Sequence, residues 1–145
     1  MKKYPVYSAL FIVLIIAILL GFPAKNKAIE NLKECKSKRI LLEELQNLMQ
    51  EGQPIAIVDA REDNNYVEGH IKGAVNIPAN KFKQDASKKL LPSNKEILVV
   101  YYCAGPRCSA ACKAAIQGKD LGYTKFHVYE GGYPEWESKG MPIEK

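Results

Sequence analysis

Three cysteines fall within residues 101–115, and we interpret this stretch as the chemical centre of the chain. An apolar, β-rich run over residues 97–102 stops at Cys103, a glycine and a proline follow, and a helical pattern of small residues starts near Ser109. The pattern predicts a strand, a tight loop and a helix, with a thiol at the end of the strand. A loop at a helix N-terminus points backbone N–H groups inward, and the helix dipole adds partial positive charge there. We therefore expect the pKa of this thiol to lie below its ordinary value.

Cys103 is our candidate catalytic nucleophile. Arg107 places a full positive charge nearby, which should lower the thiol pKa further and help to hold an anionic substrate. We expect the rest of the loop to line the substrate site, which comprises Ala104, Gly105, Pro106, Arg107, Cys108 and Ser109. The alternative is that Cys103 is a small buried apolar residue that ends a core strand.

The four cysteines are too few and too clustered to form a disulfide scaffold in a chain of 145 residues. Their clustering favours reactivity or redox control. Cys112 lies one helical turn after Cys108, and we interpret it as a core residue packed on the sheet. Cys35 lies upstream of the predicted domain and is interpreted as an incidental exposed thiol, with pairing to another cysteine as the alternative.

The charge is unevenly distributed along the chain. Residues 1–38 contain seven lysines and two glutamates, which account for the whole net charge of +5. The other 14 basic and 14 acidic residues cancel, so the folded part is neutral. No basic face for nucleic acid is predicted, and no nucleic-acid partner is expected.

The chain begins with a basic tripeptide and an apolar segment over residues 6–22. We interpret residues 1–22 as a signal anchor or signal peptide, and favour an uncleaved anchor in the membrane. Residues 23–38 are then a polar tether and residues 39–145 a single domain. We place this domain outside the cytoplasm, in the periplasm, although the lysines after the apolar segment argue for the opposite orientation.

Helical and β-type patterns alternate through the rest of the chain. A helix is predicted over residues 39–50 and another from near Ser109 to about Leu121, with surface helix and connector over residues 80–96 and a short helix after residues 131–136. Strands are predicted at residues 55–58, 74–77, 97–102 and 125–129. The alternation predicts an α/β fold with a central, mainly parallel sheet that helices flank on both faces.

Four segments together resemble the rhodanese-like sulfurtransferase domain. They are Val-Asp-Ala-Arg at residues 58–61, the Glu-Gly-His-Ile-Lys-Gly-Ala region within residues 66–78, the cysteine loop, and Glu-Gly-Gly-Tyr-Pro-Glu-Trp with the glycine and proline that follow it, at residues 130–142. The resemblance implies a rhodanese-like domain in which Cys103 accepts a sulfane sulfur as a persulfide. The implied donor is a small anion such as thiosulfate or polysulfide, and the acceptor is a thiol, cyanide or a protein. No cofactor is implied.

The loop departs from the commonest family pattern, in which an arginine stands five positions after the cysteine and a serine follows it. Here Arg107 is four positions after Cys103, Cys108 is five and Ser109 is six. The loop thus resembles a subgroup with the pattern Cys-x-Gly-Pro-x-Cys. Cys108 could resolve a persulfide on Cys103 by releasing sulfide and leaving a disulfide, or could simply fit the turn. The cysteine spacing matches no common zinc pattern, so no metal is expected.

Three polar residues near the expected site are interpreted as structural. Asp59 and Arg61 are expected to form an ion pair or a turn, and His70 to be a hydrogen-bonded histidine rather than a base.

The leading hypothesis is a sulfurtransferase that uses Cys103. The alternative is a non-enzymatic sulfur carrier or thiol redox module that uses Cys103 and Cys108. Phosphatase or arsenate reductase activity ranks last, because those enzymes place an arginine six positions after the cysteine and Arg107 is only four away.

Overall fold

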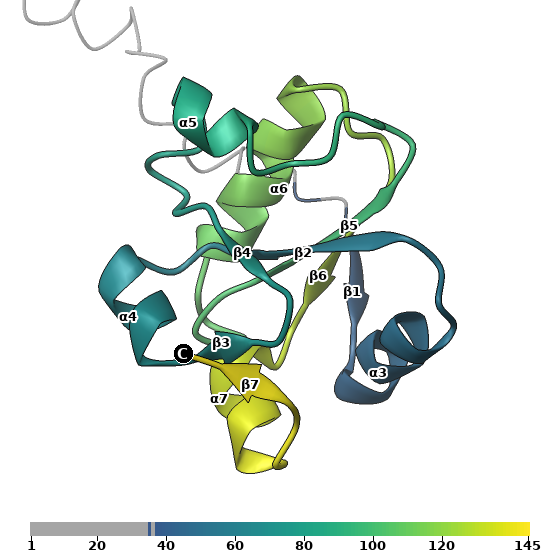
Figure 1. Ribbon diagram of the computed structural model, residues 1–145, viewed down its shortest axis with the longest axis vertical. Helices are drawn as coiled ribbons and strands as arrows, with labels where there is room; N and C mark the ends of the chain where they lie inside the picture. The colour runs from purple at the N-terminus through teal and green to yellow at the C-terminus, as the bar shows by residue number, and fades with distance from the viewer. Residues whose placement is uncertain (1–34, 36) are drawn as a thin grey trace, which may run out of the picture. The chain divides into compact units, whose positions relative to one another are not determined.

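The computed structural model describes residue 35 and residues 37–145. Its centre is a five-stranded sheet with the order β1-β6-β5-β2-β4, in which every neighbouring pair is parallel (Figure 1). The strands are β1 (Lys38–Ile40), β2 (Ile55–Asp59), β4 (Val75–Asn76), β5 (Leu98–Tyr102) and β6 (Phe126–Tyr129). The predicted α/β fold with a mainly parallel sheet is confirmed.

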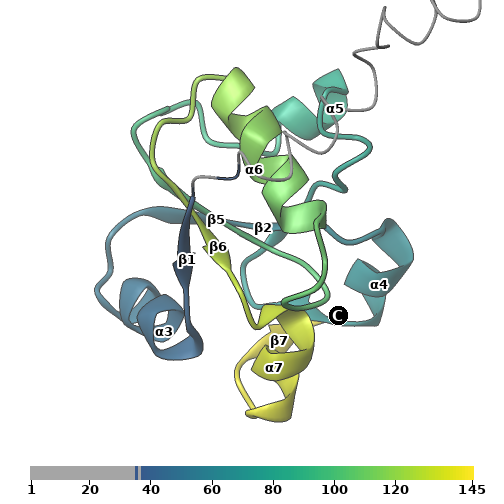
Figure 2. The same cartoon turned by 180° about the vertical axis from the view of Figure 1, so that it is seen from behind.

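Helices cover both faces of this sheet, as the two opposite views show (Figures 1 and 2). They are α3 (Leu42–Gln50), α4 (Asp63–Glu68), α5 (Asp85–Lys88), α6 (Ala110–Asp120) and α7 (Gly132–Ser138). A small second sheet pairs β3 (His70–Ile71) with β7 (Ile143–Glu144) in antiparallel fashion. It attaches the C-terminal end of the chain to the segment that follows α4.

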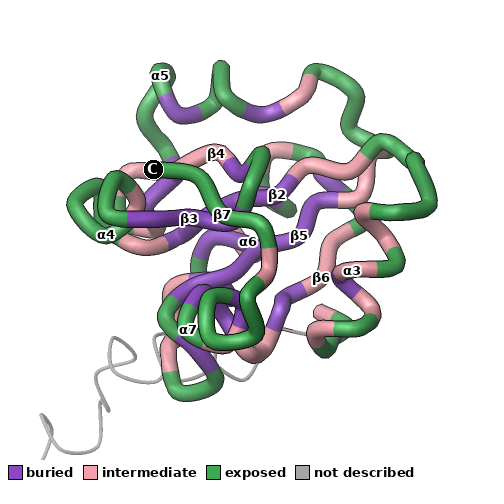
Figure 3. The backbone as a smooth tube through the Cα atoms, turned by 60° about the horizontal axis from the view of Figure 1, so that its bottom comes forward, coloured by how far each residue is buried: buried purple, intermediate pink, exposed green. Residues whose placement is uncertain are grey.

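The middle strand β5 separates two hydrophobic clusters. Val99 and Tyr101 pack in the cluster that contains the buried alanines of α6, whereas Val100 and Tyr102 pack in the cluster of α3 and α7. Successive side chains of a strand point to opposite faces, so a strand that is covered on both sides is apolar at every position. Figure 3 shows the backbone of β5 as largely buried, with exposed segments on the surrounding helices and loops.

The start of the folded domain differs from the prediction. Lys38–Ile40 form the edge strand β1 against β6, and α3 begins only at Leu42. Ile40 is fully buried by this pairing. The prediction placed residues 39–41 in the helix because a three-residue strand is too short to show its own period. Because β1 includes Lys38, the fold extends upstream of the predicted domain boundary.

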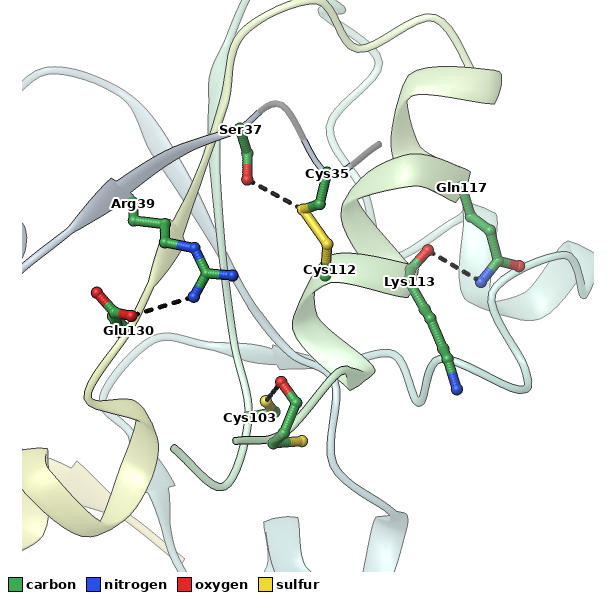
Figure 4. Close-up of a disulfide and its surroundings, with 9 residues drawn as sticks. Cys35, Ser37, Arg39, Cys103, Cys112, Lys113, Gln117 and Glu130 are labelled. Atoms are coloured by element: carbon green, nitrogen blue, oxygen red, sulfur yellow. Dashed lines mark hydrogen bonds and ion pairs between the residues drawn. A yellow bond between two sulfur atoms is a disulfide. The ribbon is translucent and has the colours of Figure 1, made fainter. Parts of the chain in front are cut away.

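A disulfide joins Cys35 to Cys112, with a Cα–Cα distance of 5.8 Å and a sequence separation of 77 (Figure 4). The interpretation of Cys35 as an incidental thiol was therefore wrong. Cys112 is buried, as expected, but as half of a covalent link. The disulfide connects the segment before β1 to the first turn of α6.

The remaining N-terminal expectations lie outside the described residues. These are the signal or anchor segment at residues 1–22 and most of the tether. Within residue 35 and residues 37–145, no helix has the length and apolar character needed to cross a membrane.

We predict that removing the disulfide destabilises the domain. In the Cys35→Ser/Cys112→Ser double variant, the free energy of unfolding should fall by about 2–4 kcal/mol, because the unfolded chain is no longer closed into a long loop. Urea denaturation without reductant measures this. Wild-type protein in reductant should match the double variant, and reductant should not affect the variant itself. A wild-type midpoint that is insensitive to reductant would contradict the prediction.

Candidate active site

The candidate nucleophile lies at the end of β5, at the start of the loop that leads to α6. Cys103 is the first residue after β5 and is only 3% exposed. Its Sγ lies 3.4 Å from the carbonyl oxygen of Cys108 and can donate to it. The backbone N–H of Cys108 donates to the Gly105 carbonyl at 3.0 Å, and Gly105 has a φ of +117°, which closes the turn. Figure 4 shows Cys103 beside the end of α6 that carries Cys112.

The two free thiols of the loop are Cys103 and Cys108, and their pKa values move in opposite directions. Burial raises the pKa of Cys103 to about 12, and hydrogen bonding with the Cys108 side chain adds to the rise. Burial also acts on half-buried Cys108, but hydrogen bonding from Cys103 and from backbone N–H groups outweighs it and lowers the pKa. The expectation of a lowered pKa at Cys103 was therefore wrong. Cys108 is thus the more acidic thiol of the pair.

Hydrogen bonding from backbone N–H groups favours the thiolate form of both cysteines, as the loop-and-helix pattern predicted. Those of Gly105 and Ala111 favour the thiolate of Cys103, and those of Ala104, Ala110 and Ala111 favour the thiolate of Cys108. The first N–H groups of a helix have no partner within the helix, and the N-cap Ser109 provides no side-chain cap here. The loop can thus stabilise one anionic sulfur. At the Cys103 thiol, however, burial raises the pKa by more than these N–H groups lower it.

The other expected substrate-binding residues differ in exposure. Ala104, Pro106 and Arg107 are exposed, Cys108 and Ser109 are half-buried, and Gly105 is buried. In the part of the chain that the structure describes, Arg107 forms no ion pair. Arg107 is exposed, so its guanidinium can meet an anion from solvent.

Asp59 and Arg61 form an ion pair at the end of β2. The Asp59 side chain is fully buried, and Arg61 donates to it from Nε at 3.0 Å and from Nη2 at 2.6 Å. Arg61 also donates to the carbonyl of Gly69 at 2.7 Å. Burial alone would lower the pKa of Arg61, but hydrogen bonding to Asp59 outweighs it and raises the pKa. The pair joins the end of β2 to the segment before β3.

Tyr102 completes this network and was not identified from the sequence. Its hydroxyl donates to Asp59 Oδ2 at 2.7 Å and accepts from the backbone N–H of Ile71 at 3.1 Å. A hydroxyl at the last position of an apolar strand, next to the cysteine, was the one available signal. The network therefore reaches the residue that precedes the nucleophile.

His70 lies away from the thiols in sequence and in its contacts. Its ring stacks on Tyr66, with ring centroids 3.7 Å apart, and Nδ1 lies 3.0 Å from the Tyr66 carbonyl. Its Nε2 lies 3.8 Å from a carboxylate oxygen of Glu144 in β7. These contacts hold the small sheet against α4.

A family model described as "Rhodanese-like domain" matches residues 41–139. The chain belongs to the rhodanese-like domain family. Rhodanese-like domains are often sulfurtransferases or related enzymes, and the match covers all the elements from α3 to α7. The finer assignment to a Cys-x-Gly-Pro-x-Cys subgroup stays a prediction.

Similar proteins bear several functional names. The chain is 31% identical to tRNA uridine(34) hydroxylase of Escherichia coli, over 67% of this chain and 29% of that protein. It is 27% identical to "Dual specificity phosphatase Cdc25" of Arabidopsis thaliana, over 61% of this chain and 66% of that one. The chain thus spans less than two thirds of either relative. A crystal structure of a Bacillus halodurans protein superposes with a TM-score of 0.65 and 30% identity, over 83% of this rhodanese-like chain and 85% of the other.

We predict that iodoacetamide labels Cys108 before Cys103. The pKa of Cys108 is lowered whereas burial raises the pKa of Cys103 to about 12, so Cys108 has the larger thiolate fraction at any given pH. Peptide mapping at pH 7.5 without reductant should show labelling of Cys108 at least about tenfold faster. In Cys108→Ser, the fast phase should vanish. Faster labelling of Cys103 in the wild-type protein would show that Cys103 is the more acidic thiol.

The adjacent tyrosines of β5 provide a matched pair for testing the buried network. Both are fully buried, but the Tyr101 hydroxyl has no hydrogen-bond partner within the described residues. Tyr102→Phe should lower the free energy of unfolding by about 1–3 kcal/mol, because Asp59 and the Ile71 N–H lose a partner. Tyr101→Phe should be neutral or stabilising. Urea denaturation of both variants measures these changes. Equal losses of unfolding free energy in the two variants would show that the hydrogen bonds of Tyr102 are not the cause.

Proposed function

We propose that this chain is a sulfurtransferase that carries sulfane sulfur on Cys103 and passes it to a thiol, cyanide or a protein acceptor. The observation that supports it best is the free Cys103 thiol at the end of β5, with the N–H groups of Gly105 and Ala111 placed to favour an anionic sulfur. The family supports the same class of chemistry. A small anionic donor such as thiosulfate or polysulfide fits the exposed Arg107 at the rim of the loop.

In the first step, Cys108 can act as the proton acceptor and Cys103 as the nucleophile. The Cys103 proton moves to the Cys108 thiolate, and the charge moves to Cys103. The Cys103 thiolate attacks the outer sulfur of thiosulfate, a new S–S bond forms, and sulfite leaves with the electron pair of the broken bond. The product is a Cys103 persulfide anion, which the backbone N–H groups of the loop stabilise.

The second step returns the site to its starting state. A thiolate or cyanide attacks the outer sulfur of the persulfide, and the Cys103 thiolate leaves with the bonding electrons. Cys103 then recovers its proton from Cys108. No other acid or base is needed, which is consistent with the structural contacts of His70 and Asp59.

The coupling of the two thiols also favours a second candidate, a sulfur carrier or redox module. Here Cys108 returns its proton to the terminal sulfur of the Cys103 persulfide, and the Cys108 thiolate attacks the inner sulfur. Hydrosulfide leaves with the electron pair of the broken bond, and a Cys103–Cys108 disulfide remains. An external dithiol restores the two thiols and is itself oxidised to a disulfide. Such a module would turn over poorly with thiosulfate and a small acceptor.

We also propose that the domain lies outside the cytoplasm, attached to the membrane through residues 6–22. The Cys35–Cys112 disulfide supports this placement, because stable disulfides are typical of oxidising compartments.

Intact mass after thiosulfate treatment tests the proposed reaction. Wild-type protein should gain one sulfur atom, Cys103→Ser should gain none, and Cys108→Ser should gain it more slowly because the proton acceptor is lost. Loss of two hydrogens without a gain of sulfur would favour the redox module. Sulfur gained by Cys103→Ser at the wild-type rate would instead assign the acceptor role to Cys108.

Release of sulfite from thiosulfate, with cyanide as the acceptor, should be fastest in the wild-type protein, slower in Cys108→Ser and absent in Cys103→Ser. An aryl phosphate serves as the comparison substrate, since one relative is named as a phosphatase. Hydrolysis of that substrate, lost in Cys103→Ser, would replace the sulfurtransferase proposal with phosphatase activity.

A further inference from the structure

The first residues of α7 lie directly against the cysteine loop. Gly132 has a φ of +65°, and a Cβ built on it would lie 2.3 Å from the carbonyl oxygen of Cys103 and 2.5 Å from the nitrogen of Gly105. Both are backbone atoms, so neither can move aside as a flexible side chain could. Only glycine allows the two backbones to come this close.

A hydrogen bond fixes the same contact. The backbone N–H of Tyr133 donates to the carbonyl oxygen of Cys103 at 2.9 Å. That carbonyl belongs to the peptide unit between Cys103 and Ala104, and the N–H of Ala104 is one of the groups that favour the Cys108 thiolate. A trans peptide is planar, so fixing its C=O also fixes the direction of its N–H. The hydrogen bond from Tyr133 thus sets the orientation of a peptide unit that begins at Cys103 and whose N–H group favours the Cys108 thiolate.

The start of α7 is itself held by the buried ion pair. The Arg61 guanidinium carbon lies 4.2 Å from the centre of the Tyr133 ring, while Arg61 is paired with Asp59. The Tyr133 hydroxyl also donates to Glu137 within α7, at 3.0 Å. These side-chain contacts hold the Gly132–Tyr133 backbone independently of the cysteine loop.

We infer that Gly132, together with the backbone N–H of Tyr133, is a positioning element for the thiol pair: it holds the Cys103–Ala104 peptide in the orientation that sulfur transfer requires. The sulfur-transfer part of this inference rests on the proposed function. The effect on the thiols does not, because it can be measured by alkylation alone.

Gly140 provides a matched control for Gly132. It has a φ of +66°, nearly the same as Gly132, but a Cβ built on it meets nothing within 4 Å in the described part of the chain. Gly132→Ala and Gly140→Ala therefore impose the same kind of backbone strain. Only Gly132→Ala also forces the cysteine loop to move.

The first readout is the pH dependence of Cys108 alkylation by iodoacetamide. In Gly132→Ala the displaced Ala104 N–H no longer supports the thiolate, so the midpoint should rise by at least about half a pH unit. In Gly140→Ala it should stay at the wild-type value. The second readout is sulfur loading from thiosulfate, which should fall about tenfold to a hundredfold in Gly132→Ala and stay within about twofold in Gly140→Ala.

Equal alkylation midpoints in both alanine variants and wild-type protein would overturn the inference. If no protein loads sulfur but the midpoint shifts only in Gly132→Ala, the proposed function fails and the positioning role stands. Should Gly132→Ala not fold, the α-hydroxy acid analogue of tyrosine at position 133 removes the N–H donor and keeps the side chain. It should raise the Cys108 midpoint in the same direction, and an unchanged midpoint in that variant would equally reject the positioning role.

Discussion

The buried ion pair of Asp59 and Arg61 is the interaction on which the site depends. A carboxylate with no solvent exposure is tolerated only if its charge is matched and its oxygens are hydrogen-bonded, and Arg61 and Tyr102 do both. The same guanidinium donates to the Gly69 carbonyl and lies over the ring of Tyr133. One charged pair thus ties together the end of β2, the last residue of β5, the segment before β3 and the turn that begins α7.

Parallel strand topology explains why these pieces meet. The carboxyl ends of parallel strands lie at one edge of a sheet, and the loops that leave them are therefore neighbours. The segments after β2, β5 and β6 supply the ion pair, the cysteine loop and the double-glycine turn, although they are about 40 and 70 residues apart in the chain. The order of the strands in the sheet, rather than distance along the sequence, therefore determines which segments meet at this site.

The four cysteines form two pairs with different roles. Cys35 and Cys112 are oxidised and link two segments that are distant in sequence, so they contribute to stability. Cys103 and Cys108 remain thiols that hydrogen-bond to each other in a partly exposed loop, so they can react. The pairs are only four residues apart at Cys108 and Cys112. What separates them is the start of α6, which directs its first N–H groups toward the reactive thiols while Cys112 bonds to Cys35.

The sequence by itself determined the fold class, the family resemblance and the position of Cys103 at the end of a strand, because the alternation of apolar runs and the Gly-Pro break are local signals. Tertiary structure decided the rest. The pKa of Cys103 could not be predicted, because desolvation depends on what packs over the thiol, and burial outweighs the helix N-terminus that the sequence revealed. The Cys35–Cys112 link and the strand β1 depend on partners 77 and about 90 residues away. The contact of Gly132 with the Cys103 carbonyl likewise exists only because the ends of β5 and β6 meet at one edge of the sheet.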